Sequence, residues 1–425
     1  MANAWIIVNG RIIDPASNRD EQGDLLVLHG RIASPGTPVP AEAKRIDASS
    51  CWVTPGLIDM HTHLREPGEE YKESILSGAQ AAAAGGFTAI ACMPNTTPVN
   101  DCAAITSFIV DRARQAAVRV YPIGAISRGS KGELLADLGE LKEAGAVAVS
   151  DDGRPVVNSQ LMRRALEYAS DFGLPVISHC EDPYLGNGTM HEGPVATRLG
   201  LRGIPSAAEA IMVYRDIALA EWTGKPVHIA HVSSSQSLEL IRMAKKRGVQ
   251  VTAETAPHYF TLTEEAAAGY DTNAKMNPPL RSEADRAAVL QALVDGTIDA
   301  IATDHAPHSC LEKECEFELA ANGIIGLESA LPLGLTLVAD DLLSPGRLVE
   351  LMTANPARIL GIPGGSLQPG AVADITIIRP DQSFTFSEAD ICSKSRNTPF
   401  LGFQMPGRAV LTMVGGEIRF EKGLR

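Results

Sequence analysis

Eight short apolar runs alternate with helical stretches along the middle of the chain, and this alternation constrains the fold more than any other feature. Between the runs, stretches such as "SQLMRRALEYASDFG" have helical periodicity, and several end at glycine, a common helix stop. Apolar strands that alternate with helices predict a parallel sheet covered on both faces. Eight such units over about 250 residues predict an α/β fold, a (β/α)8 TIM barrel. The runs are "LIDMHTH", "FTAIACMPN", "VRVYPIGAIS", "AVAVSDD", "LPVISHCED", "PVHIAHVS", "VQVTAETAPH" and "IDAIATDHAPH".

The two ends of the chain have a different residue pattern from the middle. Residues 1–54 show short strand patterns with turns, and the same pattern returns from residue 365 onward, as in "GRAVLTMVGGEIRFEKG". Each segment is too small to bury a core of its own. We therefore predict that residues 1–54 and 365–425 pair as one small β domain, while residues 55–364 form the barrel. The stretch "SPGRLVELMTANPARILG" is expected to lead out of the barrel as helix.

Charge and composition exclude several classes of protein. The net charge of −14, from 37 basic and 51 acidic residues, argues against a nucleic-acid-binding surface but allows a small anionic substrate. No apolar run approaches the roughly 18 residues that span a membrane. The first residues, "MANAWIIVNGRIID", lack the features of a signal peptide, and seven scattered cysteines fit a reducing compartment. We expect a cytoplasmic protein that acts without nucleic acid or membrane partners.

Polar residues gather where the apolar runs end, and in a TIM barrel that rim carries the active site. Two histidines one residue apart share a face of a strand, and convergent imidazoles suit a metal ion. The "SDDG" after the fourth run offers a bridging carboxylate from Asp151 or Asp152. Together with it, five rim residues are predicted to hold one or two divalent metals: His61, His63, His179, His231 and Asp304.

Other histidines fit this site less well. His228 and His305 stand at odd spacing from His231 and Asp304, so strand alternation predicts that they face away from the site, His228 toward the helices. His29 and His191 occur in loop or β-domain contexts, and all four are predicted to be structural or solvent-facing. His258 lies near the rim, and its role is left open. Cys310 and Cys315 lie in a charged stretch, residues 309–321, which predicts a mobile lid over the rim rather than a zinc site.

Eight short motifs are spread over essentially the whole chain: "HTHLREPG", "CMPNT", "SDDG", "SHCED", "KMNPPLR", "ATDHAPH", "GIIGLE" and "KSRNTPF". Together they resemble those of the dihydroorotases, within the amidohydrolase superfamily of metal-dependent barrels. The resemblance implies zinc-dependent, reversible cyclisation of N-carbamoyl-L-aspartate to (S)-dihydroorotate in pyrimidine biosynthesis, on a barrel with a small β domain built from both termini.

The resemblance also implies a role for each matching residue. The position of the ligand next to the glycine favours Asp152 over Asp151, and no lysine stands there to be carboxylated, as one is in hydantoinases. Asp304 is implied as the general acid and base. The implied metal shell is His61, His63, Asp152, His179, His231 and Asp304, and the implied substrate contacts are Arg65, Asn95, Asn277, His308 and Gly323.

The chemistry agrees with these roles. Opening a six-membered cyclic amide requires a nucleophile, a polarised carbonyl and a proton for the leaving nitrogen. A metal with its water supplies the first two, Asp304 can move the proton, and the planar fork of Arg65 suits a carboxylate.

Two alternative functions predict different sequences. A hydantoinase or allantoinase should carry the lysine and lack the carboxylate clamp. An inactive scaffold for aspartate transcarbamoylase should have lost metal ligands. We expect an active homodimer, and a complex with aspartate transcarbamoylase stays open.

Overall fold

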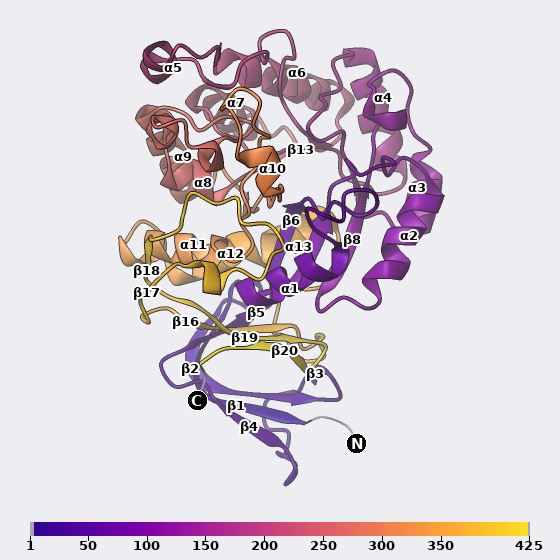
Figure 1. The fold of residues 1–425 in the computed structure, drawn as a ribbon. Coiled ribbons are helices and arrows are strands. Elements are labelled where there is room, and N and C mark those ends of the chain that lie inside the picture. Colours follow the sequence, from indigo (N-terminus) through magenta and orange to yellow (C-terminus); the bar gives the residue numbers. More distant parts are fainter. Residues whose placement is uncertain (1–3, 424–425) are drawn as a thin grey trace.

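All eight apolar runs form strands of one barrel in the computed structural model, which describes residues 4–423 (Figure 1). The strands form two parallel sheets, ordered β6-β7-β8-β9 and β10-β13-β14-β15. Bridges from Val149 to Val176 and from Thr62 to His305 join the sheets into a closed ring. This confirms the predicted (β/α)8 barrel. The strands are β6 (Leu57–Thr62), β7 (Phe87–Cys92), β8 (Arg119–Gly124), β9 (Ala148–Val149), β10 (Ile177–Ser178), β13 (Val227–Ile229), β14 (Val251–Thr255) and β15 (Ala300–Ile301).

Helices cover the barrel, and local signals set their ends. The side chain of Ser74 accepts a hydrogen bond from the Ser77 backbone to cap α1, and Ser282 caps α9 in the same way. Both helices stop at glycines in the left-handed conformation, Gly86 with φ 95° and Gly296 with φ 81°. The helices are α1 (Ile75–Gly85), α2 (Ala103–Ala113), α3 (Leu138–Ala144), α4 (Ser159–Asp171), α5 (Pro194–Leu199), α6 (Ala207–Thr223), α7 (Ser235–Lys246), α8 (Pro257–Thr261), α9 (Glu283–Asp295), α10 (Cys310–Lys313), α11 (Ala330–Ala339), α12 (Pro345–Met352) and α13 (Ala354–Leu360).

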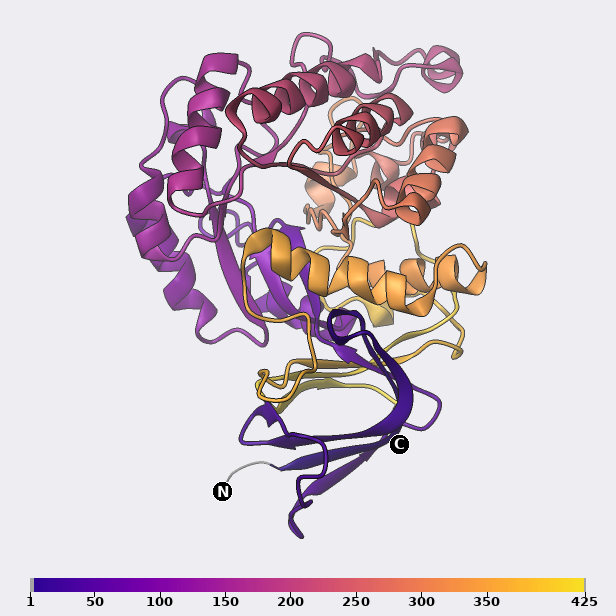
Figure 2. The same ribbon diagram turned by 180° about the vertical axis from the view of Figure 1, so that it is seen from behind.

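Both ends of the chain meet in one eight-stranded sheet below the barrel (Figure 1). Antiparallel pairing of β5 with β16 sets Val53 opposite Ile377 and joins the two halves in one buried core. Helices α11 to α13 lie at the junction of sheet and barrel (Figure 2). The sheet runs β20-β19-β16-β5-β1-β2-β3, with β4 beside β1; its strands are β1 (Trp5–Asp14), β2 (Arg19–Leu28), β3 (Arg31–Ile32), β4 (Lys44–Asp47), β5 (Trp52–Pro55), β16 (Ile375–Arg379), β19 (Arg408–Val414) and β20 (Glu417–Glu421).

The exact domain limits, at residues 54 and 365, stay a prediction. Residues 1–3 and 424–425 of the predicted terminal segments lie outside the described residues. Among residues 4–423, no helix combines the length and the apolarity needed to cross a membrane.

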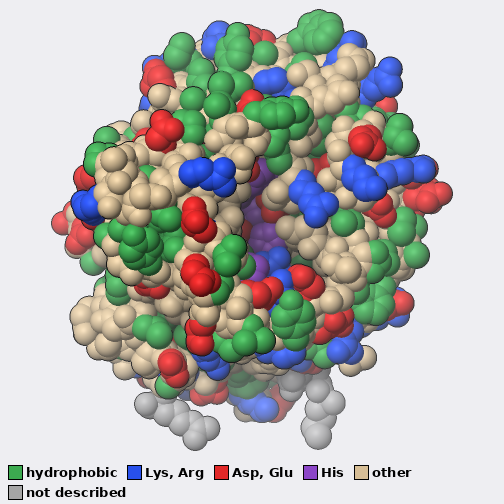
Figure 3. Space-filling model, turned by 45° about the horizontal axis from the view of Figure 1, so that its top comes forward, with side chains coloured by type: hydrophobic (Ala, Val, Ile, Leu, Met, Phe, Trp, Pro, Cys, Tyr) green, Lys and Arg blue, Asp and Glu red, His purple; other side chains and the backbone are tan. Residues whose placement is uncertain are grey.

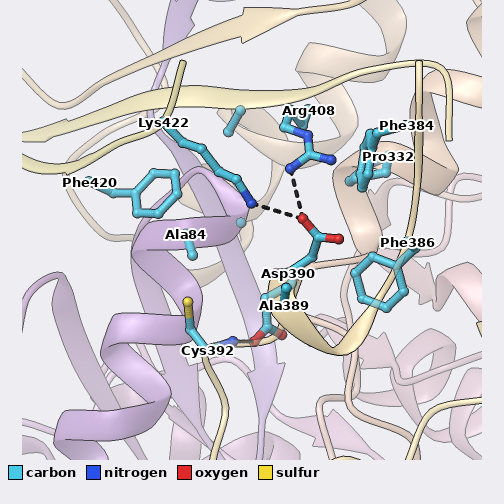
Figure 4. A pocket seen from close by; sticks show the side chains of 13 residues that line it. Ala84, Pro332, Phe384, Phe386, Ala389, Asp390, Cys392, Arg408, Phe420 and Lys422 are labelled. Atoms are coloured by element: carbon cyan, nitrogen blue, oxygen red, sulfur yellow. Dashed lines mark hydrogen bonds and ion pairs between the residues drawn. The ribbon is translucent and has the colours of Figure 1, made fainter. Parts of the chain in front are cut away.

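Part of the predicted C-terminal β segment leaves the sheet and packs on the barrel. This excursion runs between β16 and β19 and contains the short strands β17 (Phe384–Thr385) and β18 (Gln404–Met405). At its base, Asp390 accepts hydrogen bonds from Arg408 at 2.9 Å and Lys422 at 2.8 Å, beside a small pocket of about 130 Å³ (Figure 4). Further along, the amide of Asn397 donates to the carbonyls of Ala306 and Gly323. The segment therefore braces loops at the barrel rim.

Candidate active site

The predicted metal residues lie together at the C-terminal rim of the barrel. Histidine side chains are visible at the bottom of a hollow in this face of the molecule (Figure 3). Two of the residues, His231 and Asp304, follow β13 and β15 with left-handed backbones, φ 33° and 48°. Such a conformation costs a non-glycine residue about 1–3 kcal/mol, and strain of this kind clusters at functional sites.

Asp152 lies at the centre of the four predicted imidazole ligands. Its Oδ1 is 3.4 Å from His61 Nε2, 3.5 Å from His179 Nδ1 and 3.4 Å from His231 Nε2. Its Oδ2 is 3.5 Å from His63 Nε2. The second carboxylate, Asp304, places Oδ1 3.0 Å from His63 Nε2 and 3.6 Å from His61 Nε2. The potential ligand atoms fall into two groups that share His61, one with His63 and Asp304 and one with Asp152 and His231.

Asp151, the other carboxylate of "SDDG", is directed elsewhere. It accepts hydrogen bonds from the backbone N–H of Ser127, at 3.0 Å, and from the Ser127 hydroxyl. Its carboxylate therefore ties the end of β9 to the loop after β8. Of the two neighbouring aspartates, Asp152 is the one that faces the imidazoles.

The site has buried polar atoms that lack a partner. His61 Nε2 and Asp152 Oδ1 are both buried, 3.4 Å apart, and neither makes a hydrogen bond with a described residue. Burial alone would raise the pKa of Asp152, but the charge of His61 and the nearby rings of His179 and His231 hold it well below its usual range. An ionised carboxylate among imidazoles is a donor set that suits zinc, so these residues fit a divalent metal.

Another part of the wall of the same cavity is suited to an anion. The cavity measures about 280 Å³, and the predicted substrate residues Arg65, Asn95, Asn277 and His308 line it. Arg65 is buried; its Nε donates to the Pro307 carbonyl at 3.1 Å, and its Nη2 lies 3.2 Å from His308 Nε2. Burial, with the Arg65 charge, lowers the pKa of His308 to about 3, so its ring is neutral at pH 7. Arg65 is therefore the cation that this wall offers.

The remaining predicted substrate residues differ in their hydrogen-bond partners and in whether they line the cavity. Asn95 Oδ1 lies 2.9 Å from His63 Nδ1, so this amide orients a histidine as well as lining the cavity. The Nδ2 of Asn277 donates to Glu181 at 3.3 Å. Gly323 is not on the described cavity wall; its N–H donates to the Lys275 carbonyl, and its own carbonyl accepts from Lys313 and Asn397. Asn322 lines the wall in its place.

The prediction that His228 faces the helices is wrong. His228 pairs with Ile177, whose side chain packs in the barrel interior, while its neighbours Val227 and Ile229 pack with the helices. The prediction assumed that side chains alternate regularly from His228 to His231. His231 lies beyond the end of β13 and has a left-handed backbone, so the alternation does not extend to it. His305 is buried as a structural residue, with Nδ1 accepting from the backbone of Gly326.

Comparison with known proteins identifies the family. A model described as "Dihydro-orotase-like" matches residues 51–237, and one described as "Amidohydrolase family" matches residues 334–420. A dihydroorotase from Geotalea daltonii is 59% identical over 97% of this chain and 98% of its own length. One from Desulfotalea psychrophila is 60% identical over the same shares. The chain belongs to the dihydroorotase family.

Solved structures of other enzymes share the fold of this chain. The L-hydantoinase (dihydropyrimidinase) of Arthrobacter aurescens superposes with a TM-score of 0.88 at 26% identity, covering 100% of this chain and 97% of its own. The dihydropyrimidinase of Brevibacillus agri superposes with a TM-score of 0.86 at 22% identity, over 98% and 95% of the two chains. They support the barrel with its terminal β sheet as the family fold.

Several residues that shape this family site had no counterpart in the sequence prediction. Lys275 and Lys313 are buried, and their ammonium groups donate to backbone carbonyls of residues 317–323. Glu254 lies behind His61 within β14. A carboxylate inside a strand with no other charged residue was the signal available for Glu254. His258, left open above, is buried, and its Nε2 has no partner among the described residues.

Proposed function

We propose that this protein is a zinc-dependent dihydroorotase that interconverts N-carbamoyl-L-aspartate and (S)-dihydroorotate. Ring closure joins the carbamoyl nitrogen to a side-chain carboxylate, consumes a proton and releases water. The observation that carries the proposal is a single cavity that is lined by imidazoles, carboxylates and the buried Arg65. The high identity to relatives named dihydroorotase supports this reaction for the chain.

The metal-binding wall comprises His61, His63, Asp152, His179, His231 and Asp304, which would hold one or two zinc ions. When bound, zinc polarises a carbonyl and brings the pKa of water near neutrality. Asp152 would supply the carboxylate nearest the centre of this set, because its two oxygens face different imidazoles.

Asp304 is proposed to move the proton. Its carboxylate lies at the edge of the metal-binding wall and lines the cavity, so it can reach both the attacking water and the substrate. In the hydrolytic direction it accepts a proton from the water on a carboxylate oxygen and delivers that proton to the departing amide nitrogen. Ring closure uses the same carboxylate in reverse.

Arg65, Asn95 and His308 are proposed to orient the substrate through its free carboxylate. A guanidinium can bind a carboxylate through two parallel hydrogen bonds, and it is held here by Pro307. Burial strengthens that pairing because water does not compete. The neutral ring of His308 and the amide of Asn95 add polar contacts without further charge.

A hydantoinase-type activity is the second candidate, because the barrel superposes on such enzymes. Their neutral cyclic substrates would leave the Arg65 guanidinium without a partner. An inactive scaffold is disfavoured because the complete donor set is assembled. We further expect a cytoplasmic homodimer, and association with aspartate transcarbamoylase stays a prediction.

The proposal is tested by removing and restoring the metal. Chelator-treated protein should lose dihydroorotate hydrolysis and recover it on addition of Zn²⁺, as followed by the loss of dihydroorotate. Hydantoin and dihydrouracil, tested in parallel, should react far more slowly, since they lack the carboxylate. Full activity in protein shown to be metal-free, or a preference for the neutral rings, would overturn the assignment.

A further inference from the structure

A buried chain of polar groups extends from His61 into the barrel interior. His61 Nδ1 lies 2.7 Å from Glu254 Oε1, on the side of the ring away from the predicted metal wall. The other oxygen of Glu254, Oε2, lies 3.2 Å from His228 Nε2. His228 Nδ1 in turn lies 2.8 Å from the Thr252 hydroxyl. All four side chains come from strands, and His61, Glu254 and His228 are almost completely inaccessible to solvent.

Glu254 lies between two ring nitrogens, His61 Nδ1 on one side and His228 Nε2 on the other. A carboxylate taken out of water is costly unless hydrogen bonds or charges compensate it. The 2.7 Å contact with His61 Nδ1 provides such a hydrogen bond. A carboxylate accepts hydrogen bonds, so Nδ1 of His61 carries the proton. The lone pair of His61 is then on Nε2, which faces Asp152 and Asp304.

The other predicted histidine ligands have weaker support behind the ring. His63 Nδ1 meets the neutral amide of Asn95 at 2.9 Å. His179 Nε2 is 3.6 Å from Glu181, beyond hydrogen-bonding distance. His61 also belongs to both groups of potential ligand atoms. A carboxylate behind this ring therefore acts on a ligand that lies within reach of either metal position and whose single Nε2 lone pair would bind one metal.

We propose that Glu254 is a positioning residue for His61 and that His228 acts through Glu254 to hold it in place. The inference rests on the proposed metal-dependent function. Glu254 selects the His61 tautomer, fixes the direction of Nε2 and makes the ring a stronger donor, as carboxylates behind metal-bound histidines do. A Glu–His pair that merely filled the barrel would stabilise the fold without changing metal affinity.

The test is zinc affinity, measured on metal-free protein by competition with a chromophoric chelator. Glu254→Gln keeps the shape but removes the charge, and we expect it to weaken zinc binding roughly 10–100-fold. The matched control is Glu328→Gln, another buried carboxylate, which accepts two backbone hydrogen bonds at 2.8 Å from Cys392 and Ser393 and does not line the cavity. Its zinc affinity should equal that of the unaltered protein.

His228 provides the second arm of the experiment. His228→Gln should weaken zinc binding less than Glu254→Gln, and it should cause no further loss when Glu254 is already Gln, since it acts through that residue. Additive losses would overturn the role of His228. Should Glu254→Gln fail to fold, Glu254→Asp, whose shorter arm withdraws the carboxylate from His61, is measured in its place with the same expected direction.

The possible outcomes distinguish a failure of the proposed function from a failure of the positioning role of Glu254. If the unaltered protein binds no zinc, the proposed function fails. If it binds zinc and the Glu254 variants bind with the same affinity, only the positioning role fails. Equal weakening in the Glu328 control would also overturn it, because the effect would then follow from losing any buried charge.

Discussion

Two residues that line the cavity have different proposed roles, Asp304 in proton transfer and Arg65 in binding the substrate charge. Asp304→Asn keeps the side-chain shape but cannot accept a proton, so kcat should fall by roughly 10²–10⁴-fold. Arg65→Met removes a buried charge partner worth about 2–5 kcal/mol and should act mainly by raising KM. Steady-state kinetics distinguish the two, with Arg198→Met, at a surface ion pair with Glu265, as the control. An unchanged KM in the Arg65 variant would mean that the substrate carboxylate binds elsewhere.

The two neighbouring aspartates after β9 differ in what they contact. Asp152 faces four imidazoles, whereas Asp151 bonds to Ser127. Asp152→Ala should therefore cost far more activity and bound zinc per folded molecule than Asp151→Ala. Because the chain supplies this carboxylate directly, rebuilding the metal site should not depend on bicarbonate. Metal analysis and activity after reconstitution, with and without bicarbonate, check both points; the reverse ranking would refute the role of Asp152.

Among the elements, the segment at residues 309–321, which contains α10, directly follows His308 of the cavity. We predict that it is a lid that becomes ordered over bound substrate. The structure shows what restrains it: Lys275 Nζ donates to the carbonyls of Phe317 at 2.6 Å and Ala320 at 2.7 Å, and Glu312 pairs with Lys72 at 2.8 Å. Exposed Leu311 and Leu319 on the same loop offer cleavage sites for a protease.

Limited proteolysis tests this lid. Cleavage within residues 309–321 should slow when substrate is saturating, because ordering protects the backbone. Lys275→Met should speed cleavage, since it frees the loop carbonyls, while Lys131→Met at an exposed position should not. Equal cleavage rates with and without substrate would count against closure.

For the whole molecule, the terminal sheet is the part that joins residues farthest apart in the chain. Ile377 on β16 is fully buried opposite Val53 on β5, and it lies in the core formed by both chain ends. Ile377→Ala should lower the free energy of unfolding by about 2–5 kcal/mol and leave kcat of the folded enzyme unchanged. Chemical denaturation measures this, with exposed Glu417→Ala as control. A loss below about 0.5 kcal/mol would show that the two halves depend little on each other.

Local signals in the sequence were sufficient for the barrel and for the rim. Each barrel strand appeared as an apolar run, and helix ends were marked by glycines such as Gly86 and Gly296, because chain reversal depends on nearby residues. The histidines and aspartates at the ends of the runs came together since the carboxyl ends of parallel strands share one rim. Family resemblance then supplied the substrate side of the cavity.

Contacts between segments that are distant in the chain could not be predicted from local sequence signals. Side chains alternate regularly only within a strand, and both His231 and the aspartate pair lie beyond a strand end. The face on which His228 lies relative to His231 therefore depended on the backbone angles after β13. The choice between Asp151 and Asp152 depended on their neighbours, such as Ser127. Asn397 reaches Ala306 across 91 positions, and Glu254 reaches His61 across 193. Neither pairing leaves a periodic trace along the chain, because such contacts exist only once the barrel has closed and the terminal segments have packed against it.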